Sequence, residues 1–186
     1  MIALDRDLAS RIRLIVVDVD GTMTDGSLVI GSGGEEIKSF SVRDGIGIKF
    51  AQEAGLEVAL LSGRRSAIVE KRAEMLGIKL VRLGYDMKLP VVEELAGSLG
   101  VGLDAVAYIG DDVVDLVPIR KVALGVAVAD AAEDILAAAD AVAEAPGGHG
   151  AVREVIESIL RARGDWNEVV TSYLTRSGAL KGGGTA

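Results

Sequence analysis

An apolar, β-branched run passes directly into a turn in the segment Ile15-Val-Val-Asp-Val-Asp-Gly-Thr-Met-Thr-Asp-Gly26. Side chains alternate between the two faces of a strand, so Asp18 and Asp20 point to the same side if the strand continues. They flank one pocket if the strand breaks at Gly21. Two carboxylates this close repel each other, so a functional arrangement needs a cation between them. An acidic turn after a buried strand is the simpler structural alternative.

The overall composition is that of one domain with an aliphatic core. The chain has 186 residues, of which 49% are hydrophobic and only 3% aromatic. A core of Val, Leu, Ile and Ala is typical of buried parallel strands covered by helices. The net charge of −8 argues against nucleic-acid binding, which requires basic patches. No apolar run approaches the roughly 18–20 residues that span a membrane, so we expect no membrane association.

The numbers of cysteine and histidine residues limit which kinds of catalytic or metal site the chain can form. The sequence has no cysteine, which excludes a disulfide framework and favours a cytoplasmic protein. Residues 1–7 lack the basic and apolar regions of a signal peptide, which supports the same expectation. The single histidine, His149, argues against a histidine-based zinc site or a Ser-His-Asp triad, although one histidine can still act as a base.

Apolar runs and helical segments alternate along the chain. The runs predict strands at residues 12–17, 58–61, 79–83, 106–109 and 122–128, with an edge strand at 141–143. Helices are expected at 43–54, 67–77, 90–99, 131–137, 151–162 and 166–174. This alternation predicts an α/β fold with a doubly wound parallel sheet, because consecutive βαβ crossovers are right-handed. We expect one domain over 1–176 and a flexible, Gly-rich tail over 177–186.

A β-hairpin is expected over residues 28–42. Two strand-like segments, 28–30 and 37–42, flank Gly31-Ser-Gly-Gly34, which is typical of a hairpin turn. The segments are apolar, and exposed strand edges pair readily with another chain. The hairpin therefore favours an oligomer, and the alternative is that it packs on its own domain.

Polar side chains follow four of the predicted strands. They are Asp18 and Asp20, then Ser62, Gly63 and Arg64, then Lys88, and finally Asp111, Asp112 and Asp115. The carboxyl ends of parallel strands meet at one edge of the sheet, where ligands bind. Acids hold a hard cation such as Mg²⁺, whereas a hydroxyl, a lysine and backbone N–H groups hold a phosphate. Each residue alone has a simpler reading as a turn, cap or surface charge, but together they predict a phosphoryl-transfer site.

These groups resemble the four signature motifs of the haloacid dehalogenase (HAD) superfamily of phosphatases, over roughly residues 12–160. The resemblance implies that Asp18 attacks phosphorus to form an aspartyl-phosphate, and that Asp20 acts as general acid and then base. Ser62 and Lys88 resemble the groups that hold the transferring phosphoryl. The implied Mg²⁺ ligands are Asp18, the backbone carbonyl of Asp20, and Asp111, with Asp112 close behind.

The segments between the motifs are too short for a cap domain, and a resemblance to one capless subfamily suggests the substrate. Neither the interval 19–61 nor the interval 63–87 has room for the cap domain that many HAD members carry. Four segments resemble the capless subfamily of 3-deoxy-D-manno-octulosonate 8-phosphate (KDO 8-phosphate) phosphatases, which serve lipopolysaccharide precursor synthesis. They are Thr24-Asp-Gly26, Phe40-Ser-Val-Arg-Asp-Gly45, Gly110-Asp-Asp112 and Pro146-Gly-Gly-His-Gly-Ala-Val-Arg-Glu154.

The same resemblance implies a substrate site and an assembly. The implied substrate contacts are Thr24, Gly26, Arg43, Gly63, Arg64 and Arg153, because arginine binds carboxylates through two parallel hydrogen bonds. The subfamily forms homotetramers through the hairpin, and its C-terminal segment, here residues 165–174, can close over an adjacent site. Two departures from the subfamily pattern are Val114, in place of an asparagine, and Met87, in place of an aspartate.

Three alternatives stay open on the sequence alone. Relatives of the subfamily act on nine-carbon keto acid 9-phosphates, including sialate 9-phosphate. An inactive binding relative would keep the fold without turnover. The same module resembles the domain fused behind some acylneuraminate cytidylyltransferases, where activity is not guaranteed. A receiver domain also combines Asp, Ser or Thr, Lys and Mg²⁺, but it places the acid pair first and the lysine last. Asp20 has no role in a receiver, which argues against that class.

Overall fold

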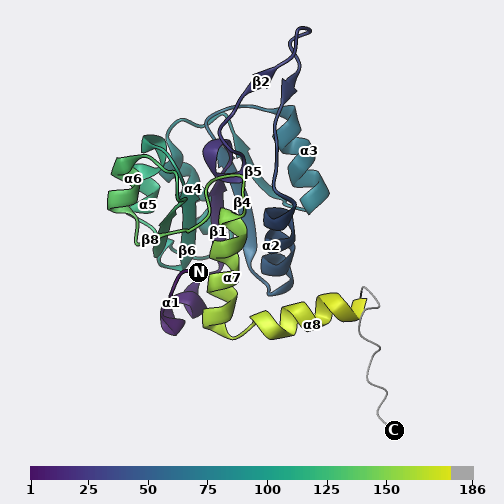
Figure 1. Ribbon diagram of the computed structural model, residues 1–186. Helices are drawn as coiled ribbons and strands as arrows, with labels where there is room; N and C mark the ends of the chain where they lie inside the picture. Colours follow the sequence, from purple (N-terminus) through teal and green to yellow (C-terminus); the bar gives the residue numbers. More distant parts are fainter. Residues whose placement is uncertain (177–186) are drawn as a thin grey trace.

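A six-stranded parallel sheet forms the centre of the protein (Figure 1). The computed structural model describes residues 1–176, and the expected tail 177–186 lies outside the described residues. The strand order is β5-β4-β1-β6-β7-β8, and every neighbouring pair is parallel. The strands are β1 (Leu14–Asp18), β4 (Glu57–Ser62), β5 (Leu80–Leu83), β6 (Val106–Gly110), β7 (Leu124–Ala127) and β8 (Ala141–Val142). The predicted doubly wound fold and its edge strand are confirmed.

Helices cover both faces of the sheet. One face carries α2 (Val42–Glu53), α3 (Ala67–Leu76) and α7 (Ala151–Arg163). The other carries α4 (Lys88–Ser98), α5 (Leu116–Ile119) and α6 (Glu133–Ala138), and the remaining helices are α1 (Arg6–Arg11) and α8 (Trp166–Arg176). The chain leaves β1 toward β4 on one side and returns to β6 on the other. This reversal is where open α/β sheets bind ligands.

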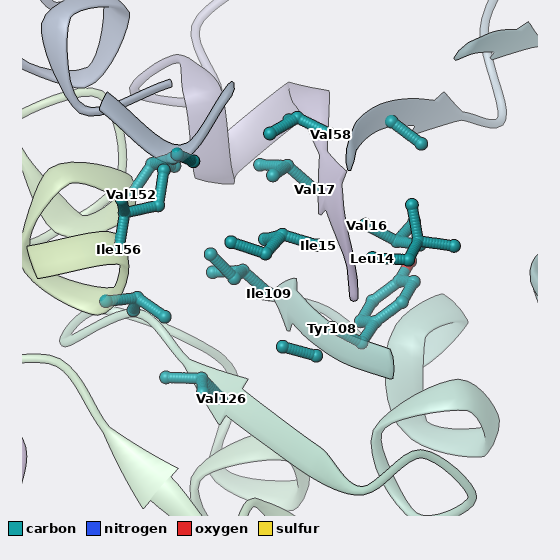
Figure 2. Packing of buried hydrophobic residues seen from close by; sticks show 14 of the residues in the cluster. Leu14, Ile15, Val16, Val17, Val58, Tyr108, Ile109, Val126, Val152 and Ile156 are labelled. Atoms are coloured by element: carbon teal, nitrogen blue, oxygen red, sulfur yellow. The ribbon is translucent and has the colours of Figure 1, made fainter. Parts of the chain in front are cut away.

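The central strand β1 is buried along its whole length, as its apolar sequence predicts. Its side chains alternate: Ile15 and Val17 point toward Val152 of α7, whereas Val16 lies on the opposite face with Tyr108 (Figure 2). Burial on both faces fixes the register of β1 against β4 and β6, because a one-residue shift would exchange the two faces. The rigid core therefore determines where β1 ends, and with it the position of Asp18.

The hairpin projects away from the sheet, and its strands are shorter than expected. Its antiparallel strands are β2 (Val29–Ile30) and β3 (Glu36–Ile37). The strand expected over 37–42 is wrong beyond residue 37, because the Ser41 hydroxyl accepts the Asp44 N–H (3.3 Å) and caps α2, which starts at Val42. Apolar side chains on the hairpin are exposed, with Ile30 exposed to 65%.

The short elements differ from expectation, whereas the last helix agrees with it. Helix α5 and the 3₁₀ turn Val113–Asp115 were not predicted, because segments of four residues or fewer are too short to show a helical period. The helix expected over 166–174 is present as α8 and packs on α2, where the centre of the Phe50 ring lies 5.6 Å from that of Trp166. In Figure 1, α8 lies at the end of the molecule opposite the hairpin. Among residues 1–176, no helix has the length and apolarity needed to cross a membrane.

Candidate active site

The catalytic segment turns sharply at the end of β1. The strand ends at Asp18, and a tight turn over Val19–Met23, the catalytic turn, follows it. Gly21 has φ +93°, a left-handed conformation that L side chains rarely adopt, and an added Cβ would clash with Asp111 Oδ2. The break expected at Gly21 is therefore present, and it gives Asp18 and Asp20 different partners.

A buried ion-pair cluster surrounds Asp18. Lys88, the first residue of α4, donates to Asp18 Oδ1 (2.5 Å) and to Asp115 Oδ1 (2.6 Å). Asp115 also accepts the Tyr108 hydroxyl (2.5 Å) and the Asp111 N–H (3.1 Å). Asp18 and Asp115 are both buried, and Lys88 brings a single positive charge to the pair, so negative charge is in excess here.

The pKa values reflect this excess charge. Burial, and then the nearby Asp115 carboxylate, raise the pKa of Asp18 well above its ordinary range. The same two causes raise the pKa of Asp111 to about 6. Burial opposes the charge on Lys88, but Asp18 and Asp115 outweigh it and raise the lysine pKa. An added cation would therefore relieve the repulsion among the acids.

The acids fit a divalent metal ion. Asp18, Asp111 and Asp115 each offer a carboxylate oxygen, and these atoms lie within 4.8 Å of one another. Oxygen donors of this kind are the ligands that Mg²⁺ prefers. Asp115 already accepts from Lys88 and Tyr108, so it lies behind the other two acids.

The place expected for Asp112, close behind the metal, is occupied by Asp115. The Asp112 side chain is exposed and accepts the Val113 N–H (2.7 Å), which caps the 3₁₀ turn. The same turn carries the Asp115 side chain back beneath Asp111, whose N–H it accepts. The metal contact expected from the Asp20 carbonyl stays a prediction.

Asp20 has a separate set of partners. Ser62, at the end of β4, donates to Asp20 Oδ2 (3.2 Å), and the Lys38 ammonium from the hairpin contacts Asp20 Oδ1. The Lys38 side chain is 1% exposed. Lys38 was not predicted as a site residue. It follows β3 in a segment where residues 36, 38 and 40 are half-buried and residues 35, 37 and 39 are exposed.

Two of the expected substrate arginines lie on the surface. Arg43 is exposed in the first turn of α2, and Arg64 is exposed beside Ser62, with its guanidinium 3.5 Å from Glu36. The Arg64 N–H donates to Ser62 Oγ (3.1 Å), which orders the loop through Gly63. A ligand can reach these side chains and this loop.

Thr24, Gly26 and Arg153 have contacts within the chain that account for them. Thr24 is fully buried, and its hydroxyl accepts the N–H groups of Gly21 (3.3 Å) and Gly26 (3.2 Å). The Arg153 guanidinium lies over the rings of Phe50 and Trp166, at 5.1 and 4.9 Å from their centres, in cation–π contact. The substrate contacts expected from these three residues stay predictions.

The glycine-rich loop 146–150 supports the catalytic turn. The Gly148 N–H donates to the Thr22 carbonyl (3.0 Å), and a Cβ added at Gly147 would clash with the Gly21 carbonyl oxygen. This close approach explains the glycine at position 147. His149 is exposed, and its Nδ1 lies 2.7 Å from the Gly147 carbonyl oxygen.

The two departures from the subfamily pattern both lie on the surface. Val114 is 51% exposed and Met87 is 77% exposed. Neither belongs to the buried cluster around Asp18, so the aspartates and the lysine keep their contacts.

Comparison with known proteins agrees with this geometry. A doubly wound sheet with acids after β1 and β6 and a lysine at the start of α4 defines the class of HAD-like hydrolases, and residues 86–156 match the family described as haloacid dehalogenase-like hydrolase. The KDO 8-phosphate phosphatase KdsC of Escherichia coli (strain K12) is 44% identical over 160 residues, which cover 86% of this chain and 85% of that protein. The chain belongs to the family of KDO 8-phosphate phosphatases.

Solved structures of KDO 8-phosphate phosphatases are also similar to this chain. The phosphatase from Moraxella catarrhalis, in complex with magnesium ion, phosphate ion and KDO, has a TM-score of 0.88 and 38% identity. The match covers 90% of this chain and 97% of that one. The cobalt-bound phosphatase from Haemophilus influenzae has a TM-score of 0.85 and 42% identity, over 90% of this chain and 99% of that one.

The raised pKa of Asp111 predicts a pH-dependent stabilisation by metal. An acid whose folded-state pKa is raised from 3.8 to about 6 lowers stability as pH rises through that range. Mg²⁺ binds the deprotonated acids, so we expect it to stabilise the protein more at about pH 7.5 than at about pH 5. At about 100 times its Kd, the gain is about 2.7 kcal/mol.

Thermal unfolding with and without Mg²⁺ at the two pH values measures this difference. The Asp111→Asn variant is expected to lose the gain at the higher pH, whereas Asp112→Asn is expected to keep it. An equal gain at both pH values would contradict the assignment of the metal to these acids.

Proposed function

We propose that this protein is a Mg²⁺-dependent phosphatase that hydrolyses KDO 8-phosphate to KDO and phosphate. The observation that carries the proposal is the buried Asp18–Lys88 pair beside Asp111, at the reversal point of the sheet. A carboxylate attacks an anionic phosphate only when cations screen their repulsion. This cluster provides one cation, Lys88, and carboxylates that could bind a metal ion. The identity of 44% to a KDO 8-phosphate phosphatase supports the substrate.

In the proposed first step, an oxygen of Asp18 attacks phosphorus. The bond from phosphorus to the sugar oxygen breaks, and Asp20 donates its proton to that leaving oxygen. The product on the protein is an aspartyl-phosphate at Asp18. Lys88 and Ser62 hold the phosphoryl oxygens and offset their charge.

In the second step, Asp20 takes a proton from a water molecule, whose oxygen attacks phosphorus. The bond between phosphorus and Asp18 breaks, which restores the carboxylate and releases phosphate. Asp18 and Asp111, with the Asp20 carbonyl, would hold the Mg²⁺. When bound, Mg²⁺ neutralises phosphate charge and favours the ionised form of Asp18, whose pKa is raised by burial.

We also propose that the protein works as a homotetramer assembled through the hairpin. Leu28, Val29, Ile30 and Ile37 are exposed there, and apolar strands with free edges associate readily. Arg43 and Arg64 are open to solvent in one chain, so a neighbouring copy would complete the substrate site. Because α8 lies opposite the hairpin, it could close over a site only in another copy.

The cellular setting and the choice among sugar acids complete the proposal. We expect a cytoplasmic setting from the cysteine-free composition.

In a phosphate-release screen, we expect KDO 8-phosphate to exceed nine-carbon keto acid 9-phosphates and simple sugar phosphates in kcat/KM. Faster release from a nine-carbon compound would change the substrate, and release from none of them would favour a non-catalytic relative.

Replacing the nucleophile tests the reaction. Asp18→Asn is expected to lower kcat for KDO 8-phosphate by at least about 10³-fold, because an amide does not attack phosphorus. Asp112→Asn is the matched control, since its side chain is exposed and outside the cluster. Phosphate release and circular dichroism are measured for both. A folded Asp18→Asn variant with appreciable turnover would refute the nucleophile assignment.

A charge on the hairpin tests the assembly. Sedimentation is expected to give a tetramer for the native protein and smaller species for Ile30→Asp, because a charge is not tolerated in an apolar interface. Val117→Asp, at an exposed position on α5, is expected to remain tetrameric. A native protein that sediments as a monomer would contradict the proposal.

A further inference from the structure

We infer that Asp44 and Asp130 are positioning residues that clamp the loop 146–150 against the catalytic turn. The inference rests on the proposed phosphatase function, because the turn directly follows Asp18 and carries Asp20. Neither aspartate is proposed to touch the substrate. Both act through the loop, and the loop acts on the backbone of the turn.

Asp44 is a fully buried carboxylate that no step of the proposed reaction uses. Its exposure is 0%, and a buried charge is costly unless hydrogen-bond donors surround it. Its Oδ1 accepts the Arg153 N–H at 2.8 Å, and the backbone N–H of Gly150 interacts with the same carboxylate. Its Oδ2 has no hydrogen-bond partner among residues 1–176. The two N–H groups that stabilise Asp44 both lie at the start of α7.

Asp44 caps the start of α7 from a different helix. The residue before α7 is Gly150, which has no side chain to accept the free N–H groups of the first turn. Asp44 supplies that acceptor, and the helix dipole also favours an acid there. Helices α2 and α7 lie side by side (Figure 1), and a Cβ added at Gly47 would lie only 3.0 Å from Arg153 Cα. The end of the loop is therefore fixed to α2.

Asp130 holds the loop nearer its beginning. It follows β7, and its Oδ1 accepts the Gly147 N–H at 2.9 Å. Asp130 is exposed, so it can be replaced without opening the core. One acid thus holds the loop at Gly147, and another holds it at its junction with α7.

The clamped loop contacts the backbone of the catalytic turn. The Gly148 N–H, between the two held points, donates to the Thr22 carbonyl at 3.0 Å. The Thr22 hydroxyl in turn donates to Asp111 Oδ1 at 3.1 Å. Thr22 is fully buried, and close-packed surroundings transmit a displacement and do not absorb it. A displaced loop would therefore shift the turn that carries Asp20 relative to Asp111.

The kinetic test compares Asp44→Ala with the native protein, using KDO 8-phosphate at saturating Mg²⁺. We expect kcat to fall by about 10²-fold, because a misplacement of about 1 Å costs this much even when the change lies far from the chemistry. We expect KM to change by less than about threefold, because the substrate contacts are kept. Asp44→Asn keeps an oxygen that accepts the Arg153 N–H, so its kcat should stay within about threefold of the native value.

Hydrogen exchange of the catalytic turn gives a second readout that does not depend on activity. The quantity measured is the exchange rate of the amides of residues 19–23, divided by that of the amides of β4 in the central sheet. In Asp44→Ala we expect this ratio to rise by at least about tenfold, because the turn opens locally when the loop no longer holds it.

Two further variants separate the clamp from a general loss of stability. Asp130→Ala releases the loop at Gly147 and should lower kcat by about tenfold with a rise in the same exchange ratio, so it decides the matter if Asp44→Ala does not fold. Ile159→Val removes a buried methyl group from α7 and should leave kcat and the ratio unchanged. Native kcat in the folded aspartate→Ala variants would overturn the inference, as would a fall in kcat without a rise in the ratio.

The native protein is assayed beside these variants. If it releases no phosphate from KDO 8-phosphate, the proposed function fails, and the exchange ratio alone decides whether the two aspartates hold the turn. If the native protein is active and the ratio does not rise in either variant, only the clamp fails.

Discussion

Lys88 donates to Asp18 and Asp115 in a place where all three side chains are buried. Removing the lysine would leave two buried carboxylates without a cation, a change that destabilises proteins by about 3–5 kcal/mol. The contact joins the start of α4 to the end of β1 and to the 3₁₀ turn that follows β6, so its geometry depends on the packing of the central sheet. Burial and the neighbouring acids raise the pKa values of Asp18 and Asp111, and this excess of negative charge is the physical reason that we propose a metal ion at this site.

The two acids at the end of β1 and in the turn after it, Asp18 and Asp20, each contact a different lysine. Lys88 holds Asp18 from the sheet side, and Lys38 holds Asp20 from the hairpin side. The left-handed Gly21 makes this separation possible, because it turns the chain directly after Asp20. The hairpin is thus both an exposed apolar surface and the source of a buried contact to the proposed general acid. Assembly and proton transfer would then depend on the same small element.

Residues whose position follows from a strand end were predictable from the sequence. Asp18, Ser62 and Asp111 follow or end buried parallel strands, and the sheet brings them together regardless of side-chain detail. Prediction failed where contacts across the fold decide the outcome. Asp112 and Asp115 are both acids after β6, and only the 3₁₀ turn shows which one points inward. Lys38 is buried by acids from two separate elements, a contact that no local pattern reveals.

The phosphoryl group can be sought directly on the protein during turnover. The native protein is mixed with Mg²⁺ and KDO 8-phosphate, quenched in acid within one turnover, and digested for mass spectrometry. We expect a phosphoryl group on the peptide containing Asp18, at the Asp18 carboxylate, and none in the Asp18→Asn variant. A phosphoryl group on another residue would contradict the proposed mechanism, as would phosphate release with no phosphorylated protein at any time.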